Sequence, residues 1–248
     1  MIKLKSRREI SLMRESGKVA AAVLQALEEA ARPGMATAEL DRLAEKMIRR
    51  AGGEPAFLGY QGFPASICAS INSEVVHGIP GLRRLKEGDI ISIDLGVVLK
   101  GYYSDTAVTF GVGKIDSRAR RLIDVTRRSL EKGIAAMGVG GHLSDISHAV
   151  QSYVESKGFS VVKTYAGHGI GTEMHEEPQV PNFGPPGRGP KLYPGMVLAI
   201  EPMVNAGSSE VEVAEDGWTV LTRDRSLSAH FEHSVALGKE GPEILTVL

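Results

Sequence analysis

Two acidic residues, Asp94 and Asp105, lie on the two strands of a predicted β-hairpin, where their carboxylates could bind a metal ion. The first strand is the β-branched run DIISIDLGVV at 89–98 and the second is YYSDTAVTF at 102–110, with Lys100 and Gly101 as the turn between them. Two acids directed into a protein interior repel each other unless a metal ion or a proton accompanies them. For the hairpin alone, the favoured alternative is that both side chains point into solvent.

The two-residue turn also predicts the register of this hairpin. It places Asp94 opposite Ala107 and Asp105 opposite Gly96, so both aspartates lie on one face of the sheet. Diagonal neighbours of this kind lie roughly 7 to 8 Å apart at the backbone, which lets two short carboxylates reach the same ion or adjacent ions. Gly96 leaves that place uncrowded.

An internal repeat adds a third carboxylate to this pair. The segment LKEGDIISID at 85–94 matches LYPGMVLAIE at 192–201 with an offset of 107 residues, and both end in an acid. Glu201 therefore corresponds to Asp94, and the apolar run MVLAI before it predicts a buried position. This period is too long for a solenoid, so we expect a duplicated helix-helix-sheet unit with the active site where its halves meet.

His168 and Glu232 complete a plausible ligand set. His168 stands between glycines in GHGIG, where missing side chains allow a backbone or a ligand to approach closely, and Glu232 shares one strand face with Ser234 and Ala236 in SLSAHFEHSVAL. One imidazole and four carboxylates suit paired Mn, Fe, Co or Zn better than a cysteine-based zinc site. Taken alone, a single histidine is more often structural than catalytic.

Competing motifs do not fit the sequence. HEEPQ at 175–179 is not an HExxH zinc helix, because Gln179 replaces the second histidine and Pro178 would break the helix. GHGIGT at 167–172 lacks the third glycine of a dinucleotide fingerprint, and GVGKID at 111–116 has neither the spacing nor the Ser/Thr of a phosphate loop. The GxSxG nucleophile motif is absent from the sequence.

Helices and strands of both halves must position these residues. Apolar steps of three and four predict a helix from Ile10 to Pro33, and a second one follows with Thr37 as its N-cap. Two more apolar stripes, which end at Gly138 and Gly158, predict a third and a fourth helix. Near the end, Trp218 to Leu221 and Ser228 to Leu237 are predicted as strands of a meander, and 181–195 is predicted as a loop.

Composition narrows the class of protein further. The 248 residues are 42% hydrophobic and 24% charged, which is ordinary for a globular chain, and 29 Lys and Arg nearly balance 30 Asp and Glu. We therefore expect no general attraction to nucleic acid or to an anionic membrane. Cys68 is the only cysteine, which excludes an internal disulfide and fits a reducing compartment. Neither a signal peptide nor a membrane span is predicted, so the cytoplasm is the expected location.

The ordered motifs resemble the type I methionine aminopeptidases, which share the pita-bread fold with prolidases and creatinase. The resemblance runs through REISLMRESGKV, SINSEVVHGIP, IDLGVVLKGYYSDT, AGHGIGTEMHEEPQVPN, AIEPMVNAG and DGWTVLTRDRSLSAHFEH, and so covers nearly the entire chain. It implies an α+β fold with a curved, mainly antiparallel sheet covered by helices. We expect one catalytic domain, 1–248, with halves of about 7–114 and 115–248.

The resemblance also implies a role for individual residues. The family's metal ligands fall on the five residues found above, namely Asp94, Asp105, His168, Glu201 and Glu232. His77 and His175 would contact the substrate and, with Glu201, serve catalysis. The methionine side chain would enter a pocket made by Tyr60, Phe63, Cys68, His77 and Trp218. Ordinary core packing is the alternative for the three large aromatic residues of that pocket.

Four residues depart from the family's usual pattern. Phe57 and Gln61 stand where smaller or histidine residues are expected, Met174 replaces an aromatic residue, and Gly96 stands where threonine is common. These changes affect the expected pocket shape and the surroundings of the metal ions. Only 26 positions separate His175 from Glu201, which leaves no room for the helical insertion of type II relatives.

The implied reaction is hydrolysis of the first peptide bond. Two divalent ions about 3.5 to 4 Å apart can share a water and lower its pKa toward about 7. Glu201 would take the proton, and His175 with one ion would stabilise the oxyanion. The expected substrates are N-termini of nascent polypeptides, including chains at the ribosome, that begin with methionine and a small second residue. We expect a monomer.

Two rival functions remain from the sequence. A proline-specific peptidase of the same fold would need an additional N-terminal domain and a different pocket. A scaffold that has lost its metal ions would not be expected to keep all five ligand positions filled.

Overall fold

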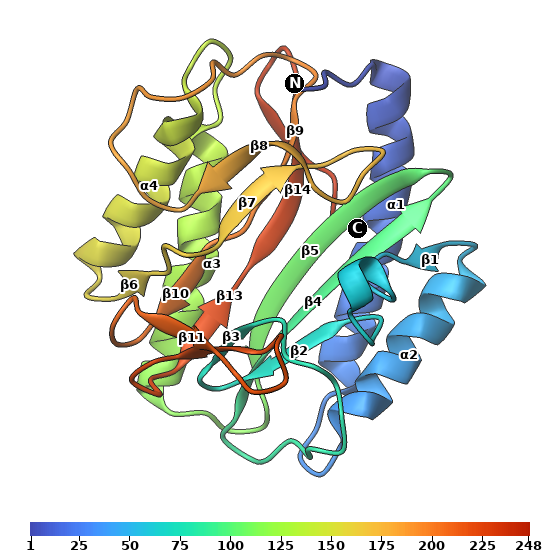
Figure 1. The fold of residues 1–248 in the computed structure, drawn as a ribbon, viewed down its shortest axis with the longest axis vertical. Helices are drawn as coiled ribbons and strands as arrows, with labels where there is room; N and C mark the ends of the chain where they lie inside the picture. The colour runs from blue at the N-terminus through green and yellow to red at the C-terminus, as the bar shows by residue number, and fades with distance from the viewer.

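The computed structural model describes residues 1–248. Four helices lie behind a large sheet (Figure 1), and they are α1 (Arg7–Ala30), α2 (Thr37–Arg50), α3 (Ser117–Ala136) and α4 (Leu143–Ser156). Their boundaries follow the apolar stripes and glycines of the sequence, as predicted. None of the helices combines the length and the apolar character that a membrane crossing requires.

The large sheet has nine strands, and all of its pairings are antiparallel. Its main path runs in the order β1 (Glu54–Pro55), β4 (Ile90–Leu99), β5 (Tyr102–Gly111), β14 (Glu232–Leu237), β9 (Val197–Ile200), β7 (Ala166–Gly169) and β8 (Glu176–Pro181). Two further strands join it, β2 (Cys68–Ile71) on β4 and β15 (Pro242–Ile244) on β14.

Two three-stranded sheets lie beside the large one. The first has the order β13 (Ser228–His230), β10 (Met203–Asn205) and β6 (Ser160–Val161). The second has the order β11 (Val211–Val213), β12 (Val220–Thr222) and β3 (Glu74–Val76). A single turn of 3-10 helix, η1 (Tyr60–Gly62), precedes β2.

The strand order has the symmetry that the internal repeat predicts. Strands β5 and β14 meet at the centre, and β4 and β9, which carry the matching segments, lie outside them. In Figure 1, α1 and α2 lie behind the half that contains β4, and α3 and α4 lie behind the half that contains β9. One apolar core joins α1 and α2 to the sheets, and two further cores join α3 and α4 to them.

The hairpin of β4 and β5 has the predicted register, with Asp94 opposite Ala107 and Gly96 opposite Asp105. The turn residues Lys100 and Gly101 have φ values of 53° and 79°, which is the left-handed backbone that a tight two-residue turn requires. The turn residues therefore fix which face the aspartates occupy.

One helix boundary and one connection differ from the prediction. The N-cap of α2 is Ala36, not Thr37, because the Thr37 hydroxyl is bonded to the backbone of Gly81 instead. The predicted meander is also wrong. The stretch from Ser228 to Leu237 divides at Phe231 into β13 and β14, which belong to different sheets, while β12 pairs with β11 and β3. Residues 182–195 contain no strand, as expected for a loop.

Candidate active site

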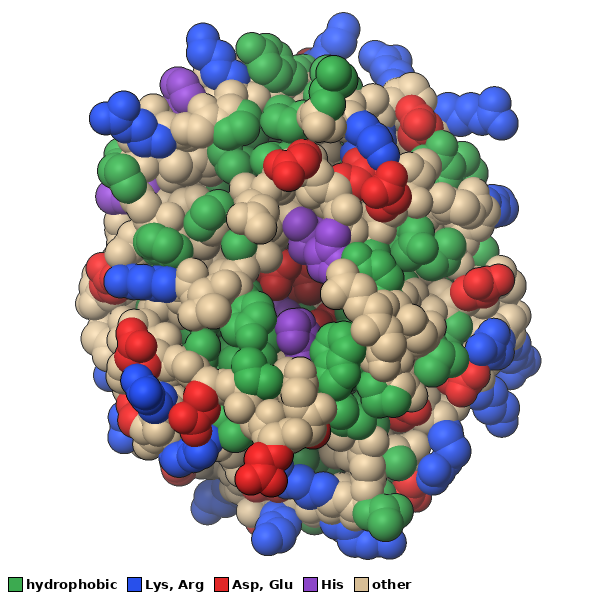
Figure 2. Space-filling view, viewed as in Figure 1, with side chains coloured by type: hydrophobic (Ala, Val, Ile, Leu, Met, Phe, Trp, Pro, Cys, Tyr) green, Lys and Arg blue, Asp and Glu red, His purple; other side chains and the backbone are tan.

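The five candidate metal ligands come from five neighbouring places on the large sheet. Asp94 lies on β4, Asp105 on β5 and His168 on β7, while Glu232 begins β14 and Glu201 directly follows β9. All five line a cavity of about 300 Å³. Figure 2 shows this hollow near the middle of the face, with acidic side chains in its depth and histidines beside them.

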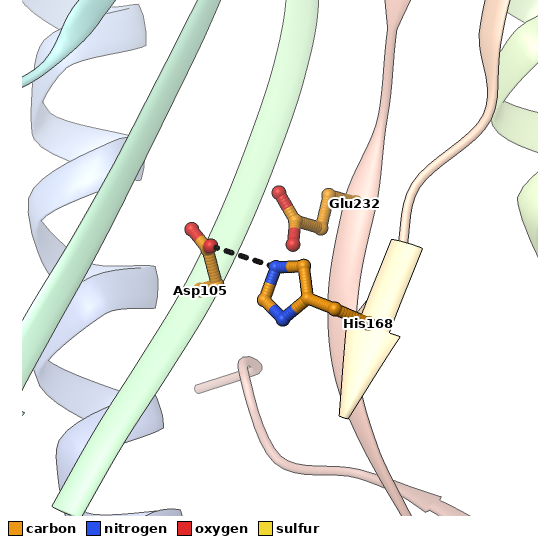
Figure 3. A group of neighbouring side chains, drawn as sticks. All are labelled: Asp105, His168 and Glu232. Atoms are coloured by element: carbon orange, nitrogen blue, oxygen red, sulfur yellow. Dashed lines mark ion pairs between the residues drawn. The ribbon is translucent and has the colours of Figure 1, made fainter. Parts of the chain in front are cut away.

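Three of these side chains lie close enough to share one ion. Ligand atoms of Asp105, His168 and Glu232 are all within 4.8 Å of one another, and Figure 3 shows the three groups directed toward a common point. Nε2 of His168 lies 3.7 Å from Oδ2 of Asp105 and 3.6 Å from Oε1 of Glu201. The five side chains are buried or nearly so.

The buried oxygen atoms here lack protein partners. Oδ1 of Asp94, Oδ1 of Asp105 and Oε1 of Glu232 accept no hydrogen bond. Burial, together with the charge of neighbouring carboxylates, raises the pKa of Asp94, Glu201 and Glu232 well above the usual range, and burial does the same to the pKa of Asp105. Such groups are normally paired with a cation, so the donor set fits divalent metal ions.

Hydrogen bonds around the cluster hold the candidate ligands in place. The imidazole of His168 donates from Nδ1 to the carbonyl of Gly169 at 2.9 Å, which leaves Nε2 for the acidic cluster. Ser234 ties β14 to β5, because its hydroxyl accepts from the Asp105 amide and donates to the Asp105 carbonyl, both at 2.9 Å. These bonds fix the strands that carry the carboxylates.

Glycines flanking His168 allow close backbone approach, as the motif predicts. A Cβ at Gly167 would lie 2.3 Å from the carbonyl oxygen of Ala199, and one at Gly169 would lie 2.3 Å from that of Glu177. Any side chain at either position would therefore separate β7 from its neighbours, β9 on one side and β8 on the other.

Two further histidines lie on the rim of the cavity. The hydroxyl of Tyr60 is 2.7 Å from Nδ1 of His175, and the rings of His175 and His168 are 4.2 Å apart. His77 packs edge-on against Trp218. Burial lowers the pKa of His77 and of His175 to about 4, helped by the nearby His175 and His168 respectively, so both imidazoles are neutral at pH 7.

An apolar pocket opens beside these histidines. Phe63 and Cys68 pack with Phe57 and Met174, and Tyr60 and Trp218 are partly buried against them. All of these side chains line the cavity. The three aromatic residues Tyr60, Phe63 and Trp218 thus combine core packing with a place on the cavity wall.

The departures from the family pattern lie together in space. A Cβ at Gly96 would be 2.8 Å from Cβ of Ala56, 3.0 Å from Cε1 of Phe57 and 3.3 Å from Cε of Met174. Gly96 therefore provides the room that the larger Phe57 side chain and Met174 occupy. Gln61 also lines the cavity, and its φ of 49° is left-handed.

Sequence reasoning gave no role to His230. Its side chain is buried, neither ring nitrogen has a hydrogen-bond partner, and Nε2 lies 3.8 Å from Oε2 of Glu201. The available signal was its place two residues before Glu232, which puts it on the same side of an extended chain. Because β13 ends and β14 begins on either side of Phe231, the sequence did not show that the His230 side chain faces Glu201.

The chain is similar to known proteins in sequence and in structure. The pattern of metallopeptidase family M24 matches residues 11–239. The chain is 56% identical to a methionine aminopeptidase of Clostridium perfringens over 248 residues, which is 100% of both chains. It is 52% identical to methionine aminopeptidase 1 of Bacillus subtilis over 246 residues, covering 99% of each chain.

Solved structures show the same fold. The crystal structure of a methionine aminopeptidase from Thermotoga maritima has a TM-score of 0.99 and 46% identity, covering 100% of both chains. A prolidase from Pyrococcus furiosus has a TM-score of 0.81 with 21% identity, covering 99% of this chain and 65% of that chain. The prolidase likeness concerns the fold alone.

Proposed function

This chain belongs to the methionine aminopeptidases of metallopeptidase family M24, and on that premise we propose how its residues remove an N-terminal methionine. The enzyme is a metal-dependent aminopeptidase with the pita-bread fold. The roles of single residues, the number of ions and the details of selectivity are our proposal.

Two divalent ions would be held by Asp94, Asp105, His168, Glu201 and Glu232. The unpartnered buried oxygens of this cluster and their raised pKa values support the assignment. Co, Mn, Fe and Zn all suit one imidazole and four carboxylates. Bound ions would supply a Lewis acid that polarises the scissile carbonyl and lowers the pKa of water.

Glu201 and two histidines would carry out the remaining steps. Glu201 is proposed to accept the proton of the attacking water and pass it to the departing amine. His175 and His77, neutral at pH 7 because burial lowers each pKa to about 4, can donate hydrogen bonds to the substrate. His175 is the proposed donor to the oxyanion that forms during attack.

Selectivity for methionine would come from the pocket of Tyr60, Phe63, Cys68, His77 and Trp218. Its mainly apolar walls favour an unbranched thioether side chain over a charged or polar one. A preference for a small second residue is part of the same proposal.

The setting of the enzyme follows from the same proposal. We propose that residues 1–248 act as one catalytic domain with halves 7–114 and 115–248, as a monomer in the cytoplasm. Because 29 basic residues nearly balance 30 acidic ones, the protein has no net charge that would attract nucleic acid. We propose that it recognises nascent N-termini, including those at the ribosome, through local contacts.

The convergence of five buried ligand side chains on one cavity carries this proposal. Release of methionine from Met-Ala-Ser by the metal-loaded protein, compared with cleavage of an Xaa-Pro dipeptide, tests the substrate class. We expect efficient hydrolysis of the tripeptide and none of the dipeptide. Preferential cleavage of the Xaa-Pro bond would contradict the proposed pocket.

A further inference from the structure

A buried ion pair joins the start of the chain to the strand that follows His175. Nζ of Lys5 lies 2.5 Å from Oε2 of Glu176, and only 6% and 2% of the two side chains are exposed. Figure 1 shows the start of the chain at the edge of the sheet where β7 and β8 are connected. The sequence motif HEEPQ contains Glu176, but the proposed reaction does not use it.

Both partners of the pair are anchored on more than one side. The backbone amide of Lys5 donates to the Gly195 carbonyl at 2.7 Å, and its Nζ also donates to the Lys3 carbonyl at 3.1 Å. The second oxygen of Glu176 accepts from the amide of Thr172 at 3.0 Å. The pair therefore connects the N-terminal segment to the segment 171–176.

A glycine makes room for this arrangement. A Cβ at Gly171 would lie 2.4 Å from Cε of Lys5 and 2.7 Å from Oε1 of Glu176. The amide of Tyr103 donates to the Gly171 carbonyl at 2.8 Å, which ties the same segment to β5. The ion pair thus occupies the space that a side chain at residue 171 would need.

His175 directly precedes Glu176, the first residue of β8, and the two side chains point to different surroundings. The imidazole of His175 lies beside His168 and the Tyr60 hydroxyl in the cavity, while Glu176 reaches away from it to Lys5. We propose that Lys5 is a positioning residue, which acts through Glu176 to hold His175 in place for the substrate. This inference rests on the substrate role proposed for His175.

Loss of Lys5 would leave the buried Glu176 carboxylate without its buried partner, and the remaining basic neighbour, Lys3, is exposed and 3.9 Å away. Such a charge is strongly unfavourable in a protein interior, so the segment 171–176 would move to expose it to water. A displacement of about 1 Å in a catalytic group can cost on the order of a hundredfold in rate. We therefore expect Lys5→Met to lower kcat at least tenfold, although Lys5 touches neither the substrate nor the candidate ligands.

The experiment is a double-mutant cycle with His175. The metal-loaded parent, Lys5→Met, His175→Ala and the double variant are assayed on Met-Ala-Ser, at a temperature where circular dichroism shows each to be folded. If Lys5 acts through His175, Lys5→Met lowers kcat in the parent background and has little further effect in the His175→Ala background. Arg49→Met is the matched control, because the Arg49–Glu45 pair on α2 is exposed, involves neither Glu176 nor the segment 171–176, and should not affect kcat.

Glu176→Gln replaces Lys5→Met in the cycle if the latter does not fold, since glutamine keeps the shape and acceptor oxygen of Glu176 without its charge. The inference is overturned if the variant used keeps the parental kcat, even with a lower melting temperature. It is also overturned if that variant lowers kcat equally in both backgrounds. An unchanged kcat for His175→Ala would instead refute the proposed role of His175.

Discussion

The four carboxylates of the cavity, three buried and one nearly so, are unfavourable in their charged form unless cations lie among them. Three of them have an oxygen without any hydrogen-bond partner, and their pKa values are raised. Neighbouring side chains bond mainly to the backbone of these residues, so the oxygens remain free for ligation. At the scale of the residue, the site is therefore built to bind positive charge.

Asp105→Asn should separate metal binding from folding. We expect at least about a hundredfold loss of kcat/KM on Met-Ala-Ser, because even outer-shell changes at metal sites cost 10- to 100-fold. The metal-free variant should melt no lower than the metal-free parent, since one buried charge is removed and the backbone bonds to Ser234 remain. Calorimetry and the peptide assay measure the two effects. Near-parental turnover would refute the ligand role.

Cys68 should be a slowly reacting thiol. It is buried, and burial, followed by the charge of Asp94, raises its pKa well above the ordinary value. The reactive thiolate is therefore scarce at pH 7.5, and alkylation by iodoacetamide should be at least about tenfold slower than that of free glutathione. Mass spectrometry over time provides the rate. A rate equal to that of glutathione would show that the pocket is open and its thiol ionised.

At the scale of the element, a few turn and glycine positions determine how strands carry these residues. The turn at Lys100 and Gly101 was readable from sequence, and it led to the register that puts Asp94 and Asp105 on one face. The division of the chain at Phe231 was not readable, because two short strands in different sheets have the same alternating pattern as one long strand. For that reason His230 was missed while Glu232 was found.

Gly96→Ala tests the space beneath Phe57 and Met174. The added Cβ would contact Ala56 at 2.8 Å and Phe57 at 3.0 Å, so we expect a loss of about 1 to 3 kcal/mol in unfolding free energy by urea titration. KM for Met-Ala-Ser should rise because the new Cβ would also crowd Met174, and both Phe57 and Met174 line the cavity.

Gly81→Ala is the matched control for this substitution, since the nearest atom to its Cβ would be 4.0 Å away. It should leave both KM and stability nearly unchanged. Equal effects of the two substitutions would show that crowding at Gly96 is not the cause.

At the scale of the whole molecule, the two halves meet at β5 and β14, and the candidate ligands gather around that junction. The internal repeat predicted this meeting because matching segments of a duplicated unit occupy equivalent places. The location of the pocket residues came from resemblance to a family, since Tyr60 lies in a single 3-10 turn and Trp218 in a bend, and periodicity describes neither. The Lys5–Glu176 pair joins segments 171 residues apart, and no local pattern indicates such a contact.

Metal removal should make stability depend on pH in a definite direction. Each raised carboxylate pKa means that the folded metal-free protein binds more protons than the unfolded chain, so its stability falls as pH rises toward the folded pKa. Above pH 7 the histidines are neutral in both states and do not oppose this trend.

We therefore expect the melting temperature of the metal-free protein to fall below that of the metal-loaded protein by an amount that grows as pH rises above the ordinary carboxylate range. Scanning calorimetry of both forms in the same buffers measures the difference. A difference that shrinks with rising pH would contradict the sign of this effect.

The central claim is that five side chains from both halves bind the ions on which hydrolysis depends. The most direct measurement is methionine release from Met-Ala-Ser by fully chelated protein during titration with Mn, Co, Fe or Zn. The account predicts no release without metal, and recovery that saturates at no more than two ions per chain. Full activity in the chelated protein, or no recovery with any of the four metals, would contradict it.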